Sequence, residues 1–146
     1  MSNGRAVAET LRIGDVVGEV VISVTEEMVD AYAAAVGDFS PLFKEKDASG
    51  RRLAHSELLP KLATDSLWVA LFERMPNIRA KQTYVYLEPV QTGRTYRTIG
   101  VVADKYGKRD RLFVVFEAIF KDESGKEVLR DRRTQLVLTE EATIKK

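Results

Sequence analysis

The sequence predicts an α+β fold in which a curved antiparallel sheet wraps around one long central helix. Three features of the chain indicate this fold. Apolar residues recur at helical spacing over about 57–74, whereas from Ile78 onward they recur at every second position. The segments between the later strands, "YGKRD" and "ESGK", fit short hairpins, which join antiparallel neighbours. The apolar surface of the helix is wider than one stripe, so we expect burial on more than one side.

The first third of the chain predicts a strand, a helix and a sharp exit turn. Residues 1–11 are expected to form a loose leader. The β-branched segment Gly18–Val24 predicts a strand. Thr25 is a good N-cap, and two glutamates and a helical apolar spacing follow it, which predicts a helix over 26–36. Gly37 stands where a helix C-cap would, so the next residues begin an exit loop.

The rest of the chain predicts the long helix and four more strands. Pro60 is tolerable only in the first turn of that helix, and "MPN" ends it near Met75. The strands are expected at about 79–88, 94–104, 111–121 and 127–138. One face of the third of these is fully apolar and is formed by Leu112, Val114, Phe116, Ala118 and Phe120.

Composition limits the kind of protein this can be. A chain of 146 residues fits one domain, 1–146. Its net charge of +1 gives no reason to expect a nucleic-acid partner. With no cysteine and one histidine, a metal site would need carboxylates alone, and we expect neither a metal nor a cofactor. We find no apolar targeting core and no window of roughly 18 apolar residues, so a cytoplasmic protein without membrane contact is expected.

Three motifs resemble the MaoC-like family of hot-dog hydratases and dehydratases. They read "YAAAVGDFSPLF", "LAHSELL" and "LEPVQTGRTY", and together they cover most of residues 12–138. The resemblance implies the hot-dog fold. It also implies substrates carried as thioesters of coenzyme A or acyl carrier protein. Family members add water to a trans-2-enoyl group or remove it from an (R)-3-hydroxyacyl group.

The first motif departs from the active family pattern, which reads approximately G-D-x-N-P-L/I-H. In active members the Asp and His together position and deprotonate the water. Here Asp38, Pro41 and Leu42 match, but Ser40 replaces the Asn and Phe43 replaces the His. An aromatic residue there resembles the amino-terminal half of two-domain members and the non-catalytic subunit of heterodimeric dehydratases, whose partners supply the Asp-His pair. "AHSELL", by contrast, resembles the active branch.

The catalytic candidates are Asp38 and His55, and each has a structural alternative. Asp38 would face the acyl site, or it would only cap backbone N–H groups in its turn. His55 would hold the loop while backbone amides at the helix start polarise the thioester carbonyl, or it would be a structural histidine at that helix start.

The substrate-binding candidates are hydroxyl, aromatic and basic side chains. A core Thr bonded to a carbonyl on the preceding turn is the simpler interpretation of Thr64. The arginines would contact phosphates of coenzyme A or phosphopantetheine, or would be solvated hairpin charges. Tyr84 and Tyr86 share one strand face and are expected to line an interface or tunnel. The candidates are Ser40, Phe43, Ser56, Thr64, Arg109, Arg111 and Arg132.

Three functions are compatible with these residues. The first is an acyl-thioester-binding subunit that needs a second hot-dog domain bearing the Asp-His pair. The second is a self-sufficient (R)-specific hydratase that uses Asp38 and His55. An acyl-thioester hydrolase, with Asp65 on the long helix as its carboxylate, is a third possibility. We expect a homodimer or a heterodimer that associates through sheet edges.

Overall fold

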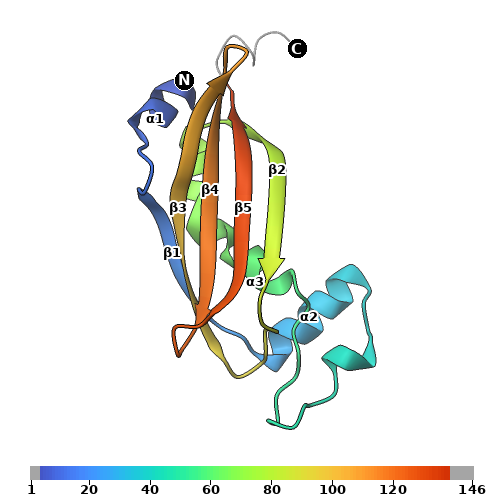
Figure 1. The fold of residues 1–146 in the computed structure, drawn as a ribbon. Helices are drawn as coiled ribbons and strands as arrows, with labels where there is room; N and C mark the ends of the chain where they lie inside the picture. Colours follow the sequence, from blue (N-terminus) through green and yellow to red (C-terminus); the bar gives the residue numbers. More distant parts are fainter. Residues whose placement is uncertain (1–3, 139–146) are drawn as a thin grey trace.

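The computed structural model describes residues 4–138 and shows a five-stranded antiparallel sheet curved around one long helix (Figure 1). This confirms the predicted fold class. In chain order the elements are α1 (Gly4–Thr10), β1 (Val16–Ser23), α2 (Glu26–Val36), the 3₁₀ turn η1 (Pro41–Phe43), α3 (Leu58–Thr64), the π-helical segment η2 (Asp65–Val69), α4 (Ala70–Arg74), β2 (Asn77–Tyr86), β3 (Thr95–Lys108), β4 (Arg111–Asp122) and β5 (Glu127–Val137).

The strands lie in the order β1-β3-β4-β5-β2, so β1 and β2 are the two edges of the sheet. Observed strand bounds agree with the predicted ones within a few residues, with one exception. β3 continues to Lys108 instead of ending near residue 104, because the β3–β4 hairpin needs only two turn residues. These are Arg109 and Asp110, which both adopt the positive φ of a tight hairpin turn, 52° and 61°.

α2 begins and ends where the sequence predicts. The Thr25 side chain accepts a hydrogen bond from Met28 N at 3.2 Å, which satisfies one free N–H of the first turn. Gly37 ends the helix in the left-handed conformation, with φ of 72°. The helix therefore ends at Val36, Gly37 caps it, and the loop that begins with Asp38 leaves at a fixed angle.

The long helix runs continuously through α3, η2 and α4, close to its predicted range, but its middle turn is π-helical. Leu67 and Trp68 of η2 are almost fully buried, and Trp68 packs on Phe116 of β4 with ring centroids 5.5 Å apart. Apolar spacing alone does not reveal such a turn, because one extra residue shifts the periodicity only locally. Within residues 4–138 there is no helix long and apolar enough to cross a membrane.

The prediction of a loose leader over residues 1–11 is wrong for residues 4–10, which form α1. Ala8 is fully buried in the core. The Lys105 ammonium on β3 donates to the carbonyl oxygens of Ala8 at 3.1 Å and Leu11 at 2.6 Å, so a distant strand satisfies the end of this short helix. That support comes from almost 100 residues away in the chain, so local sequence patterns do not predict it.

The edge strand β1 and the long helix approach each other closely at Gly18. A Cβ atom built there would lie 2.6 Å from the carbonyl oxygen of Leu67 and 2.7 Å from that of Ser66. Only a residue without a side chain fits, because backbone atoms of the helix occupy the space. Gly18 therefore sets the distance between the edge strand and the helix.

We predict that Gly18→Ala destabilises the protein by about 1–3 kcal/mol, because the methyl group must push the strand from the helix. Gly107→Ala in β3 is the matched control, since a Cβ there lies 3.7 Å from its nearest neighbour, an ordinary contact. Urea denaturation of both variants measures the difference. Equal midpoints for the two variants would contradict the close approach.

Candidate functional site

The loop after α2 is held in shape by its own polar side chains. The Asp38 carboxylate accepts a hydrogen bond from Ser40 N at 3.2 Å through Oδ1. Ser40 Oγ in turn accepts from Leu42 N at 3.4 Å and caps the 3₁₀ turn that contains Phe43. Both side chains thus stabilise the turn by accepting hydrogen bonds from backbone N–H groups, which agrees with the interpretation of Asp38 as a turn aspartate. The second oxygen of Asp38 remains available for other contacts.

Asp38 and His55, the two catalytic candidates, lie side by side although 17 residues separate them. His55 Nε2 is 3.8 Å from Asp38 Oδ2 and 3.3 Å from the Asp38 backbone oxygen. The imidazole is 5% exposed, whereas the Asp38 side chain is about half exposed. His55 O accepts from Leu58 N at 3.0 Å, which places the histidine at the start of the long helix, as predicted.

Two aromatic rings enclose His55. Phe43 stacks on the imidazole with ring centroids 3.8 Å apart and 25° between the planes. Tyr32 of α2 contacts it at 5.0 Å in a tilted arrangement. His55 Nδ1 is buried and has no hydrogen-bond partner among residues 4–138. Phe43 therefore covers the only histidine in the chain.

Arg52 holds these residues in place, a role that the sequence alone does not indicate. Its side chain is 9% exposed, and its Nε donates to Phe43 O at 2.8 Å. Its Nη2 donates to Asp30 Oδ1 at 2.7 Å, and its Nη1 lies 3.4 Å from Glu26 Oε1. The hydrogen bond from Arg52 to Asp30 lowers the pKa of the Asp30 carboxyl. Arg52 thus ties the loop to α2 and holds the backbone of Phe43 against His55.

A cleft of about 330 Å³ opens on this loop. Asp38, Phe39, Ser40 and Phe43 all line it, but His55 does not. The remaining lining residues are Asp30, Ala33, Lys44 and Arg52. The cleft therefore offers the half-exposed carboxylate of Asp38, a second carboxylate that is paired with Arg52, two phenyl rings and a basic rim.

A second cleft, of about 280 Å³, contains the candidate Ser56. Tyr86 of β2 also lines it, and its ring stacks on that of Tyr84 with centroids 5.9 Å apart. Burial raises the pKa of the Tyr86 phenol, the nearby Glu57 carboxylate raises it further, and a hydrogen bond with Ser56 opposes both effects. The two tyrosines share one strand face as the sequence predicts.

The other substrate-binding candidates lie away from Asp38. The Thr64 hydroxyl donates to Pro60 O at 3.0 Å, which is the simpler interpretation given above. Arg109 lies in the β3–β4 turn and Arg111 just after it, at the opposite end of the sheet from α2 (Figure 1). Arg132 on β5 pairs with Glu117 of β4 at 3.2 Å. Within one copy of the chain these arginines do not join the site.

The comparisons with known proteins define the fold. No family model and no curated protein matches the chain, but 152 chains of solved structures do. R-hydratase PhaJ1 from Pseudomonas aeruginosa is 22% identical with a TM-score of 0.71, covering 91% of this chain and 86% of that one. The HadBC (3R-hydroxyacyl-ACP dehydratase) complex from Mycobacterium tuberculosis is 17% identical with a TM-score of 0.71, covering 85% and 96%.

A third solved structure names the fold itself. A hot-dog-like protein from Thermanaerovibrio acidaminovorans is 16% identical with a TM-score of 0.64, covering 94% of this chain and 90% of that one. Together with the sheet wrapped around a 17-residue helix, these likenesses show that the chain has the hot-dog fold. At these identities they show the fold alone, and the activity has to be inferred from the site.

Proposed function

We propose that this protein is a MaoC-like subunit that binds acyl thioesters within an (R)-specific enoyl-thioester hydratase or 3-hydroxyacyl dehydratase. The observation that carries the proposal is the stack of Phe43 on the buried His55. In this arrangement the cleft contains the carboxylate of the expected catalytic pair but no accessible imidazole. The complete Asp-His pair would come from a second hot-dog domain.

The chemistry explains why the missing imidazole matters. Hydration joins the oxygen of water to the β-carbon of the enoyl group and a proton to the α-carbon, and a base must take a proton from that water. One oxygen of Asp38 already accepts Ser40 N–H, and His55 Nε2 faces the Asp38 main chain. The carboxylate can orient a water molecule in the cleft, but Phe43 stands in place of the histidine of the active pattern and covers His55.

Two further observations support the proposal. The solved structures with this fold include an R-hydratase and a dehydratase complex. Edge strand β2 also carries exposed apolar side chains, including Ile78 and Val85, which suit pairing with another sheet edge. The sequence-based prediction of edge association is part of this proposal, with either a second copy or a different hot-dog chain as partner.

A self-sufficient hydratase is the second candidate, and the proximity of Asp38 to His55 favours it. In that case His55 would orient Asp38, and Asp38 would take the proton. The thioester hydrolase gains no comparable support, because Asp65 is exposed on the long helix and lies in neither cleft near Asp38 or Ser56.

Binding of butyryl-coenzyme A, which has no double bond to hydrate, tests the proposed ligand class. We expect calorimetric titration of the protein to give a Kd between about 1 μM and 1 mM, the usual range of substrate affinities. Phe39→Glu should weaken binding at least about tenfold, because it places a negative charge in the cleft beside the thioester's anionic carrier.

Leu42→Glu provides the control for that variant. Leu42 and Phe39 are almost equally exposed, at 57% and 58%, but Leu42 does not line the cleft. We expect its affinity to match that of the unmodified protein. If the unmodified protein shows no binding up to millimolar ligand, or if both variants weaken binding equally, the proposed acyl-thioester site is wrong.

A further inference from the structure

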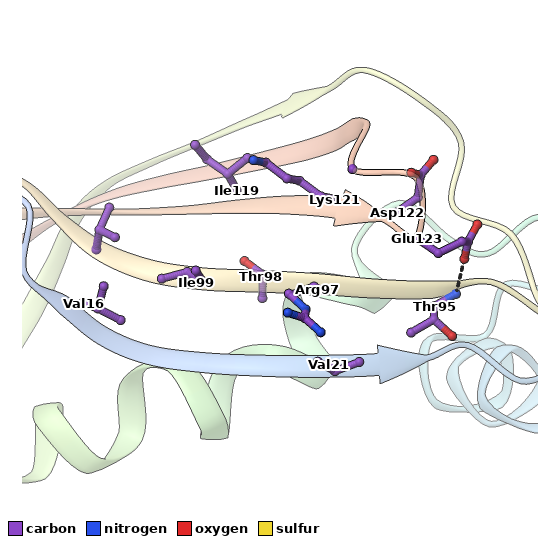
Figure 2. Close-up of a pocket in the computed structure, with 12 residues that line it drawn as sticks. Val16, Val21, Thr95, Arg97, Thr98, Ile99, Ile119, Lys121, Asp122 and Glu123 are labelled. Carbon is purple, nitrogen blue, oxygen red and sulfur yellow. Dashed lines mark hydrogen bonds between the residues drawn. The ribbon is translucent and has the colours of Figure 1, made fainter.

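A broad hollow lies on the sheet face that points away from the long helix. It measures about 630 Å³ and spans β1, β3 and β4 (Figure 2). Aliphatic side chains from all three strands form it, and Val16, Val21 and Ile99 are 61%, 51% and 40% exposed. Val101 and Ile119 extend the same surface. Contiguous exposed aliphatic groups of this kind mark contact surfaces.

Charged side chains of both signs border this patch. Asp122 and Glu123 pair with Arg94, whereas three others lack partners within the described part of the chain. Arg97 and Lys121 stand directly opposite each other in the β3–β4 register, an unfavourable pairing of like charges. Glu19 stands opposite Ile99 in the β1–β3 register. Among residues 4–138 none of these three makes an ion pair or a side-chain hydrogen bond, in contrast to Arg132, which pairs with Glu117. The patch therefore presents unpaired cations and an unpaired anion.

The register places these groups on a simple grid around Ile99. One step along β3, about 7 Å away, lies Arg97, and one step across to β1, about 5 Å away, lies Glu19. A twofold axis that passes over the Ile99 side chain, parallel to the sheet and diagonal to its strands, approximately exchanges the along-strand and across-strand directions. Two sheets related by this axis cross at about 90°, one of the two preferred angles for sheets that pack face to face.

We propose that this patch is an interface for a second copy of the chain, packed face to face with strands nearly perpendicular. Ile99 then lies on the axis, and Arg97 faces the partner subunit's Glu19 while Glu19 faces the partner subunit's Arg97. A twofold contact requires a surface that is complementary to itself. A patch with free charges of opposite sign, one step from its centre along the strand and one step across it, meets that requirement. This contact differs from edge association and does not depend on the proposed catalytic role.

Sedimentation velocity and light scattering of the full chain over a range of concentrations test the interface. The unmodified protein should reach twice the mass of the Ile99→Asp variant, because an aspartate on the axis meets the partner subunit's aspartate. Arg97→Glu and Glu19→Arg should each raise the dissociation concentration at least about tenfold, since each places like charges together. Combining the two reverses both charges and should restore the affinity of the unmodified protein.

The double variant Arg97→Glu with Glu19→Arg distinguishes loss of the interface from loss of folding. Both side chains are exposed, and circular dichroism should show the same fold in every variant. Equal masses for the unmodified protein and Ile99→Asp would overturn the proposal and leave the patch free for a different occupant. A halved mass in Ile99→Asp with no recovery in the charge-reversed double variant would also overturn it, because the orientation derived from the register would be wrong.

Discussion

Replacing Phe43 by histidine should raise hydration of crotonyl-coenzyme A by about 10²- to 10⁴-fold, the usual contribution of a positioned general base. Phe43 lines the same cleft as Asp38, so an imidazole there would face the water that the carboxylate orients. Arg52 holds the backbone at this position through the carbonyl oxygen, and this contact does not depend on the side chain. Steady-state kinetics at neutral pH measures the gain.

Two further variants identify the source of that gain. Asp38→Asn in the Phe43→His background should remove it, because the new base would lose the carboxylate that orients the water. Ser40→Asn together with Phe43→His should raise the rate further if the loop is slightly misplaced, since an error of about 1 Å can cost on the order of 10²-fold. No gain in either histidine variant would mean that Asp38 does not face the acyl group.

Asp131→Ala should destabilise the protein by about 3–5 kcal/mol, because it leaves the buried Arg133 without its counter-ion. The two side chains are only 2% and 8% exposed, and the guanidinium lies 5.1 Å from the centre of the Trp68 ring. Gln82 Nε2 also donates to Asp131 Oδ1 at 3.0 Å and would lose that partner. Chemical denaturation measures the loss.

Glu117→Ala is the matched control for that variant. Glu117 of β4 pairs with Arg132, which lies between Asp131 and Arg133 on β5, but these side chains are 21% and 49% exposed. Removal of an exposed pair costs about 1 kcal/mol or less. A loss in Asp131→Ala no larger than that in Glu117→Ala would show that water reaches the Asp131–Arg133 pair.

The features that the sequence predicts correctly are those that depend on residues close by in the chain. The N-cap at Thr25, the left-handed Gly37 and the alternating face of β4 depend on neighbours a few residues away, and the structure confirms them. α1 and the role of Arg52 depend on contacts with distant segments, so no pattern in the sequence revealed them. Arg51 and Arg52 follow Gly50 in a charged segment, and only the fold brings Glu26 and Asp30 to Arg52.

The candidate site divides in the same way. The sequence identified Asp38, His55 and the unusual Phe43 by their positions within motifs. It could not show that Phe43 would stack on His55, because the two residues lie on a loop and at a helix start that meet only in the folded chain. That contact separates a covered histidine from an accessible base, and therefore separates the two proposed functions.

The most direct test of the proposed function is the rate at which the unmodified protein, without any partner, hydrates crotonyl-coenzyme A. The covered imidazole predicts a kcat below about 0.1 s⁻¹, at least 10²-fold under the value of roughly 10 s⁻¹ typical of enzymes. Asp38→Asn measured in parallel shows whether any residual rate belongs to this site. A kcat near 10 s⁻¹ that Asp38→Asn abolishes would contradict the subunit role and establish a self-sufficient hydratase.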